Sequence, residues 1–183
     1  MKLLVVSDCE AGLPTLPAGT PELVVCCGDV PRDVLERVVT RYGVPCLGVL
    51  GNHDPALPAA FMQEVHLKVV EVASVTFGGC GGSWRYKPRG HHLYDDGQVE
   101  ALLRGFPRVD VFVAHNPPAR APASPKRAHD APDDVHNGFA AFRRYIEEEQ
   151  PALFLHGHVH RSAETTVGRT RVVAVLGARM VES

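Results

Sequence analysis

The chain has 183 residues, and a fold of this size buries about two-thirds of its unfolded surface without a disulfide or a structural metal. Hydrophobic residues make up 45% and charged residues 22%, which is typical of a globular protein and argues against a disordered chain. The formal net charge of −2 gives no strong attraction to extended nucleic acid or to an anionic membrane. We therefore expect one domain over residues 1–183, in which any bound metal serves function.

The cysteines indicate a reducing compartment. Their number is odd, and most lie in apolar, strand-like runs. They are Cys9, Cys26, Cys27, Cys46 and Cys80. The apolar run at the start is too short for a signal peptide, and no apolar run approaches a membrane span. We predict a cytoplasmic protein that does not bind membranes.

The first part of the chain alternates short strands with a helix. Wholly apolar runs, typical of strands buried on both faces, cover residues 3–6, 23–27 and 46–50. A helix is predicted over residues 31–42, because Pro31 suits a first turn, Asp33 complements the helix dipole and Gly43 ends the apolar stripe.

The second part combines a hairpin with further strands and helices. The pattern predicts a hairpin over residues 67–77, a glycine cluster over 78–82, a short helix over 99–103, and strands over 109–114, 152–155, 163–167 and 171–176. Residues 117–137 hold five prolines and are predicted to be a functional loop. Asn137 is expected to cap a helix whose Phe139, Phe142 and Ile146 face inward.

Polar side chains follow five of the predicted strands. They are Asp8 with Glu10, Asp29, Asn52 with His53, His115, and His158 with His160. In mixed sheets of the α/β type, ligands bind beyond the carboxyl ends of strands, so these groups are expected to converge. Carboxylates with imidazoles suit divalent Mn, Fe or Zn, and two such ions about 3.5–4 Å apart can hydrolyse a phosphate ester.

In sequence order these segments resemble the signature of the calcineurin-like metallophosphoesterase superfamily, which is D-x-H, G-D, G-N-H-[DE], a lone His and G-H-x-H. The chain departs from it at Glu10, where the family has histidine. The altered first motif, together with G-G-S-W-R-Y at residues 81–86 and H-N-G-F at His136 to Phe139, is similar to a bacterial subgroup. The resemblance implies an α/β (α+β) fold: a four-layer α/β/β/α sandwich with two mixed β-sheets packed face to face.

The resemblance also implies two divalent metal ions bridged by Asp29. One site would use Asp8, Asp29 and His160, with Glu10 in place of the missing imidazole; the other would use Asp29, Asn52, His115 and His158. His53 would protonate the leaving oxygen, Asp54 would orient its ring, and a metal-bridging hydroxide would be the nucleophile. Mn is the favoured metal, with Fe, Zn, Mg or Ni as alternatives.

Several residues keep two interpretations. Glu10 is either a metal ligand or a solvated side chain, and Arg85 either contacts substrate or lies on the surface. Tyr86 is a candidate substrate contact beside Arg85, whereas His156 is interpreted as a packed histidine rather than a further ligand. We expect hydrolysis of a small phosphodiester, such as a cyclic nucleotide, or of a phosphomonoester. The alternative is a non-catalytic or weakly active metal-binding scaffold on the same fold, which the altered residue at position 10 makes conceivable but the retained His53 and nearly complete ligand set argue against.

Overall fold

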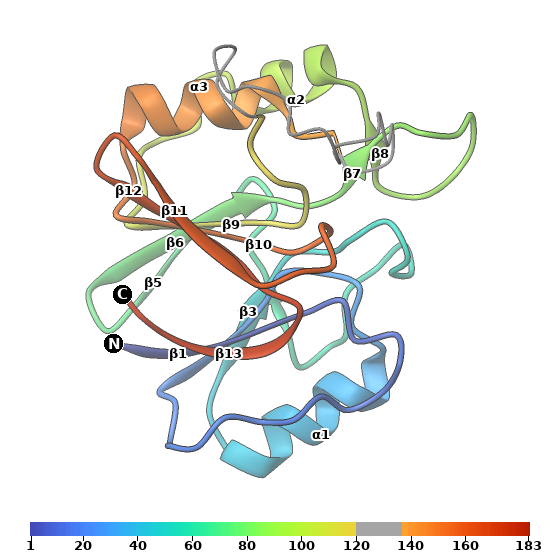
Figure 1. Cartoon of the computed structure of the whole chain (residues 1–183), viewed down its shortest axis with the longest axis vertical. Helices are drawn as coiled ribbons and strands as arrows, with labels where there is room; N and C mark the ends of the chain where they lie inside the picture. The colour runs from blue at the N-terminus through green and yellow to red at the C-terminus, as the bar shows by residue number, and fades with distance from the viewer. Residues whose placement is uncertain (120–136) are drawn as a thin grey trace.

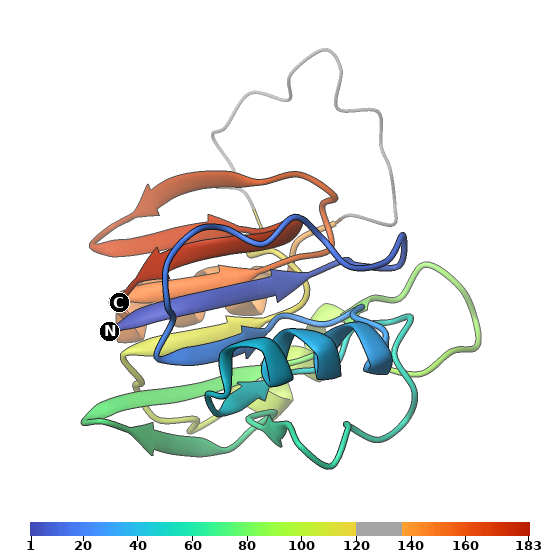
Figure 2. The same ribbon diagram turned by 90° about the horizontal axis from the view of Figure 1, so that it is seen from below.

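The structure is a computed structural model that describes residues 1–119 and 137–183. Most of the predicted proline-rich loop, including His136, therefore lies outside the described residues. Two large mixed sheets lie face to face, with helices on their outer sides (Figures 1 and 2). Among the described residues, no helix has the length and apolar character needed to cross a membrane.

The first sheet has the strand order β13-β1-β2-β3-β4. Its members are β1 (Lys2–Ser7), β2 (Leu23–Cys26), β3 (Cys46–Gly48), β4 (Gln63–Glu64) and β13 (Gly177–Glu182). The strands β1 to β4 run parallel, while β13 pairs antiparallel with β1. The carboxyl ends of β1, β2 and β3 therefore meet at one edge of the sheet.

The second sheet has the strand order β11-β12-β10-β9-β6-β5. Its members are β5 (Val69–Val72), β6 (Val75–Cys80), β9 (Val111–Ala114), β10 (Leu153–His156), β11 (Ala163–Val167) and β12 (Thr170–Ala174). The pair β5 and β6 forms the predicted hairpin. A short parallel pair, β7 (Ser83–Trp84) and β8 (Leu93–Tyr94), lies beyond the end of β6.

Three apolar clusters join the four layers. The first lies between the sheets and takes alternate residues of the central strands, such as Val25 and Val113. In the second, Val34 and Val38 of α1 (Arg32–Tyr42) pack on the outer face of the first sheet. In the third, α2 (Asp96–Leu103) and α3 (Ala140–Glu149) cover the second sheet, where Phe112 is buried. The predicted four-layer sandwich is confirmed.

The helix ends show which local signals decided them. Gly43 ends α1 with a left-handed backbone (φ 63°), as the sequence predicts. Asp95 begins α2 earlier than predicted, through a capping box with Gln98. The prediction that Asn137 caps α3 is wrong, because the helix begins after Phe139, and the Asn137 carbonyl accepts a hydrogen bond from Asn116 instead.

The last strand, β13, was missed by the sequence patterns. Its residues are mostly half-buried and lack alternation, so no period of two stands out. Gly177 turns the chain with a positive φ of 77° and sends it from the second sheet back to the first. The final residues thereby pair with the first strand of the chain.

We expect Asp110 to make the fold more stable at neutral than at acidic pH. Its Oδ2 accepts hydrogen bonds from the backbone N–H and hydroxyl of Thr76, at 2.8 and 2.6 Å, and these bonds hold the pKa of Asp110 below its usual value. Stability from a lowered carboxyl pKa is present above the unfolded pKa and is lost as pH falls through the folded pKa. Asp110→Asn should therefore lower the free energy of unfolding at pH 7 by about 1 kcal/mol. Urea titrations should show this difference disappear in acid; a difference that persists there would contradict the assignment.

Candidate metal centre

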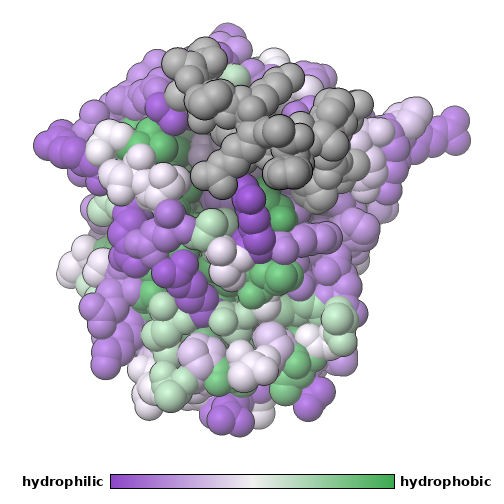
Figure 3. Space-filling view, viewed as in Figure 1, coloured by the Kyte–Doolittle hydropathy of each residue, from purple (hydrophilic) through white to green (hydrophobic). Residues whose placement is uncertain are grey.

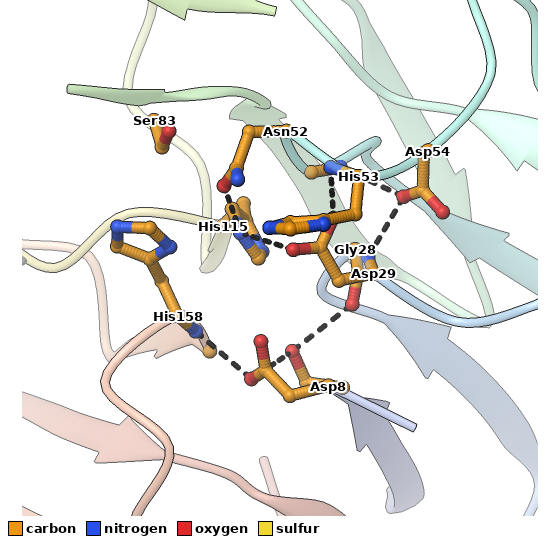
Figure 4. Close-up of polar contacts among 12 residues, drawn as sticks. Asp8, Gly28, Asp29, Asn52, His53, Asp54, Ser83, His115 and His158 are labelled. Carbon is orange, nitrogen blue, oxygen red and sulfur yellow. Dashed lines mark hydrogen bonds and ion pairs between the residues drawn. The ribbon is translucent and has the colours of Figure 1, made fainter. Parts of the chain in front are cut away.

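Acidic and imidazole groups from three strand ends meet at the edge where both sheets finish. Asp8 follows β1, Asp29 follows β2, and His115 follows β9, so the three come from both sheets. Their ligand atoms lie within 4.8 Å of one another, and all three residues are buried (Figure 4). The sequence predicted this convergence, and the structure places the three groups together.

The backbone is left-handed at four of the predicted ligands. The values of φ are 52° at Asp8, 55° at Asp29, 66° at His158 and 47° at His160. This region disfavours side-chain-bearing residues, costs about 1–3 kcal/mol for each of them, and persists only where the surroundings hold it. Here the Asp8 N–H donates to the Gly28 carbonyl at 3.2 Å, which holds one of these turns. The strained turns redirect the side chains at the strand ends toward the centre.

Glycine is required beside two of these turns because there is no room for a side chain. A methyl group at Gly157 would overlap the Ser7 hydroxyl and the Asp8 carboxylate. A methyl group at Gly51 would overlap the Asp29 carboxylate and the His115 ring. The glycines therefore let neighbouring loops approach the acidic groups closely.

Asp29 and His115 form a buried ion pair at the centre. The His115 Nδ1 lies 2.8 Å from the Cys27 carbonyl, which leaves Nε2 to face Asp29 Oδ2 at 3.2 Å. Burial alone would lower the pKa of His115, but its interaction with the Asp29 carboxylate outweighs burial and raises that pKa to about 9. Burial likewise acts to raise the pKa of Asp29, but His115 and the His53 N–H hold that pKa below its usual value. Without a metal, the imidazolium of His115 balances this carboxylate.

Two buried carboxylate oxygens accept no well-formed hydrogen bond in the part of the chain that the structure describes. They are Asp8 Oδ1 and Asp29 Oδ2, of which the second has only its ion pair with His115 Nε2 at 3.2 Å. The other Asp8 oxygen accepts bonds from the Ser7 hydroxyl and the His158 N–H, both at 2.9 Å. Burial raises the pKa of Asp8, so its charge is incompletely compensated. A cation between the two unsatisfied oxygens would remove both penalties, so the residues present fit a divalent metal.

The histidines after β10 border the same space. The rings of His158 and His115 lie with their centroids 4.9 Å apart. His160 is half-exposed, and its Nε2 lies 3.7 Å from Asp8 Oδ1. His156 is buried, with Nδ1 3.0 Å from the Gly157 carbonyl, and burial lowers its pKa to about 4. His156 is therefore a neutral packed residue, in agreement with the interpretation that the sequence favoured.

The loop after β3 supplies an amide beside these rings. Asn52 Oδ1 lies 3.1 Å from His115 Nε2, while its Nδ2 donates to the Tyr86 hydroxyl at 3.4 Å. The Asp54 carboxylate accepts the N–H groups of Asp29 and Gly51, each at 2.8 Å. Asp54 therefore joins two ligand-bearing loops, rather than orienting the His53 ring as expected.

Glu10 lies on the open side of the centre. Its carboxylate groups with Asp29 and His53, all three having ligand atoms within 4.8 Å, and it is exposed to solvent. The expected site of Asp8, Asp29, His160 and Glu10 therefore shares Asp29 with the observed group, in which His53 is the third member. A carboxylate beside the exposed His53 is within reach of both the ring and a metal held by Asp29.

Arg85, directly after β7, is one of the residues that kept two interpretations. Its guanidinium donates to the Leu93 carbonyl at 2.7 Å and to Gln98 at 3.1 Å, so it braces this segment, and its contact with substrate stays a prediction. Asn116, which sequence reasoning missed, is buried and accepts from the Trp84 N–H at 3.3 Å. Its position directly after the lone His115 was the available signal.

Comparisons with known proteins agree with this geometry. A family model described as a calcineurin-like phosphoesterase superfamily domain matches residues 1–178. The fold is similar to protein TT1561 of Thermus thermophilus, at 16% identity and a TM-score of 0.64 over 94% of this chain and 88% of that one. It is also similar to phosphopantetheinyl hydrolase from Mycobacterium tuberculosis, at 13% identity and a TM-score of 0.64 over 98% and 95% of the two chains. A search of curated proteins finds no match.

Proposed function

Because the chain belongs to the calcineurin-like phosphoesterase superfamily, whose members are generally metal-dependent phosphoester hydrolases, we propose that it hydrolyses phosphate esters with two divalent metal ions. The substrate class we favour is a small phosphodiester, such as a cyclic nucleotide, with a phosphomonoester as the alternative. Mn is the favoured metal because carboxylate, amide and imidazole ligands occur together.

The observation that carries this proposal is the pair of unsatisfied buried oxygens on Asp8 and Asp29. Buried carboxylates without donors are unfavourable unless a cation compensates them. Both oxygens share one cluster with His115, and the Glu10 carboxylate lies within 4.8 Å of Asp29 on the open side, beside the His53 ring. Asp29 therefore lies between two groups of candidate ligands, as expected of a carboxylate between two ions.

Each nearby residue then has a defined task. The metals, when bound, would activate water and neutralise the phosphate. Asp54 and Gly51 fix the loop that carries Asn52, so that its amide oxygen faces the centre. His53 is exposed beside the cluster, which places its ring where it could protonate a departing alkoxide.

The test is turnover of bis(p-nitrophenyl) phosphate and p-nitrophenyl phosphate by chelator-treated protein, with and without added Mn. We expect Mn-dependent release of nitrophenol, and a rate lower by about a hundredfold in His53→Ala, because general acid catalysis has that magnitude. Metal content of His53→Ala should equal that of wild type, since the ring is assigned a catalytic task.

No turnover of either substrate with Mn, Fe, Zn, Mg or Ni would instead support the scaffold alternative. The exposed Glu10 in place of a histidine is the observation that favours that alternative. Equal rates for wild type and His53→Ala would remove His53 from the mechanism but leave the metal centre in place.

A further inference from the structure

A positively charged segment projects beside the metal centre. Residues 85–92, called here the basic finger, lie between β7 and β8 and extend past the strand ends (Figures 1 and 2). The finger contains Arg85, Lys87, Arg89, His91 and His92 but no acidic residue. Its projecting tip is hydrophilic in the space-filling view (Figure 3).

The finger is held against the loop that carries Asn52 and His53. At one point, Asn52 Nδ2 donates to the Tyr86 hydroxyl at 3.4 Å. At another, His92 Nε2 lies 3.0 Å from the Pro55 carbonyl. At its base, the N–H groups of Ser83 and Arg85 donate to the carbonyls of His92 and Tyr94 at 2.8 and 2.9 Å. These contacts fix the finger relative to the candidate metal ligands.

Lys87 lies over the ring of Tyr86, the finger residue that contacts Asn52. Its Nζ lies 5.0 Å from the centroid of the Tyr86 ring, whose hydroxyl contacts Asn52. Such a cation–π contact restrains an exposed ammonium group without neutralising it. Arg89 is exposed and has no ion-pair partner within residues 1–119 and 137–183, whereas Arg85 is occupied by Leu93 and Gln98. Within the described residues, two cations of the finger therefore have no carboxylate partner.

The charge of the metal centre explains why Lys87 and Arg89 would help to bind a second anionic group. Asp8, Glu10 and Asp29 together offset most of the charge of two divalent ions. An anionic group beyond the scissile phosphate would therefore gain little from the metals and would be repelled by the exposed Glu10. A restrained ammonium beside the centre would reverse this repulsion.

We propose that Lys87, assisted by Arg89, forms a subsite for a second anionic group, phosphate or carboxylate, on the substrate. This inference rests on the proposed hydrolase function in so far as the bound molecule is called a substrate. The binding of a second anionic group at the subsite can be measured without turnover. It narrows the substrate class to phosphate esters that carry a further negative charge.

The test compares the binding of paired ligands that differ by one anionic group. Mn-loaded protein in a His53→Ala background, which suppresses turnover, is titrated calorimetrically with thymidine 5′-monophosphate and thymidine 3′,5′-bisphosphate. Fructose 6-phosphate and fructose 1,6-bisphosphate provide a longer spacing, and a phosphate ester with a carboxylate, 3-phosphoglycerate against glycerol 1-phosphate, tests the other anion. We expect a preference for the doubly charged member that Lys87→Met lowers about fivefold, and that Lys87→Met with Arg89→Gln lowers further.

A matched control is Arg41→Gln on α1. Arg41 also lies over a tyrosine ring, 5.8 Å from the centroid of Tyr42, but on the opposite side of the first sheet from the finger. It should leave every preference unchanged, and added salt should weaken the wild-type preference. If no pair shows a preference, or if Lys87→Met and Arg41→Gln have equal effects, the subsite is refuted. A Lys87-dependent preference without any turnover in wild type would refute the hydrolase function and retain the subsite.

Discussion

Replacement of Asp29 by asparagine should lower Mn-dependent turnover at least about a thousandfold, a loss of about 4 kcal/mol of transition-state stabilisation. The amide keeps the shape and can still accept from the His53 N–H, but it removes the charge shared by both ligand clusters. Metal analysis after dialysis should find two Mn per wild-type chain and at most one in the variant. The matched control is Asp33→Asn, an exposed acidic residue in the first turn of α1.

A second measurement on the same variant does not depend on catalysis. In the metal-free protein, the Asp29 carboxylate raises the pKa of His115 to about 9, while burial acts in the opposite direction. In Asp29→Asn, burial should prevail, so the His115 pKa measured by NMR should fall below that of a free histidine. An unchanged His115 pKa, together with two bound Mn, would show that Asp29 is not the shared carboxylate.

Among the substitutions proposed for this protein, Gly157→Ala should lower the free energy of unfolding most. It should also abolish turnover. The added methyl group would overlap the Ser7 hydroxyl and the Asp8 carboxylate, and both of these groups are buried. To relieve this overlap, the Asp8 carboxylate must move away from the His158 N–H, from which it accepts a hydrogen bond. The substitution should therefore disturb both the candidate metal site and the packing around it. We expect the free energy of unfolding to fall by about 2–4 kcal/mol, as for other overpacked or network-breaking substitutions.

Gly97→Ala is the matched control for that substitution. Gly97 lies within α2, and an added methyl group would meet only Asp95 Oδ1 at 3.5 Å, an ordinary contact. Because alanine favours a helix over glycine, this variant should be as stable as wild type or up to about 1 kcal/mol more stable. Denaturant unfolding and metal content should be measured for both variants. Equal stability and equal metal content in the two would contradict the close approach of Gly157 to Asp8.

The sequence predicted the convergence of the candidate ligands better than it predicted the turns that bring them together. Short apolar runs followed by Asp8, Asp29 and His115 indicate both the buried strands and the edge where these groups meet. The same sequence pattern does not indicate the left-handed backbone at Asp8 and Asp29, because tertiary contacts with neighbouring loops impose that conformation. The surroundings of His115 explain its raised pKa, and they too exist only after folding.

Errors arose where a local signal competed with a distant partner. Asn137 has the side chain of a helix cap, but buried Phe139 packs against Trp84 and sets the start of α3. Asp54 follows a histidine and was interpreted as its partner, yet its carboxylate accepts hydrogen bonds from two backbone N–H groups of different loops. The sequence alone could not show which of the competing contacts would form. In each case the actual partner lies on another segment, which the sheets bring close only in the folded protein.

The pairing of β13 with β1 has a consequence for how the protein forms. Lys2 is opposite Glu182 and Ser7 is opposite Gly177, so the strand that leads into Asp8 is completed by a strand that lies far from it in sequence. Contacts of such high sequence separation slow folding, since a long loop must close before they form. During translation, the first sheet would keep an unpaired edge along β1 until β13 has left the ribosome. The candidate metal centre would therefore reach its final form only after β13 pairs with β1, and added metal should bind tightly to residues 1–183 but weakly to a chain truncated before β13.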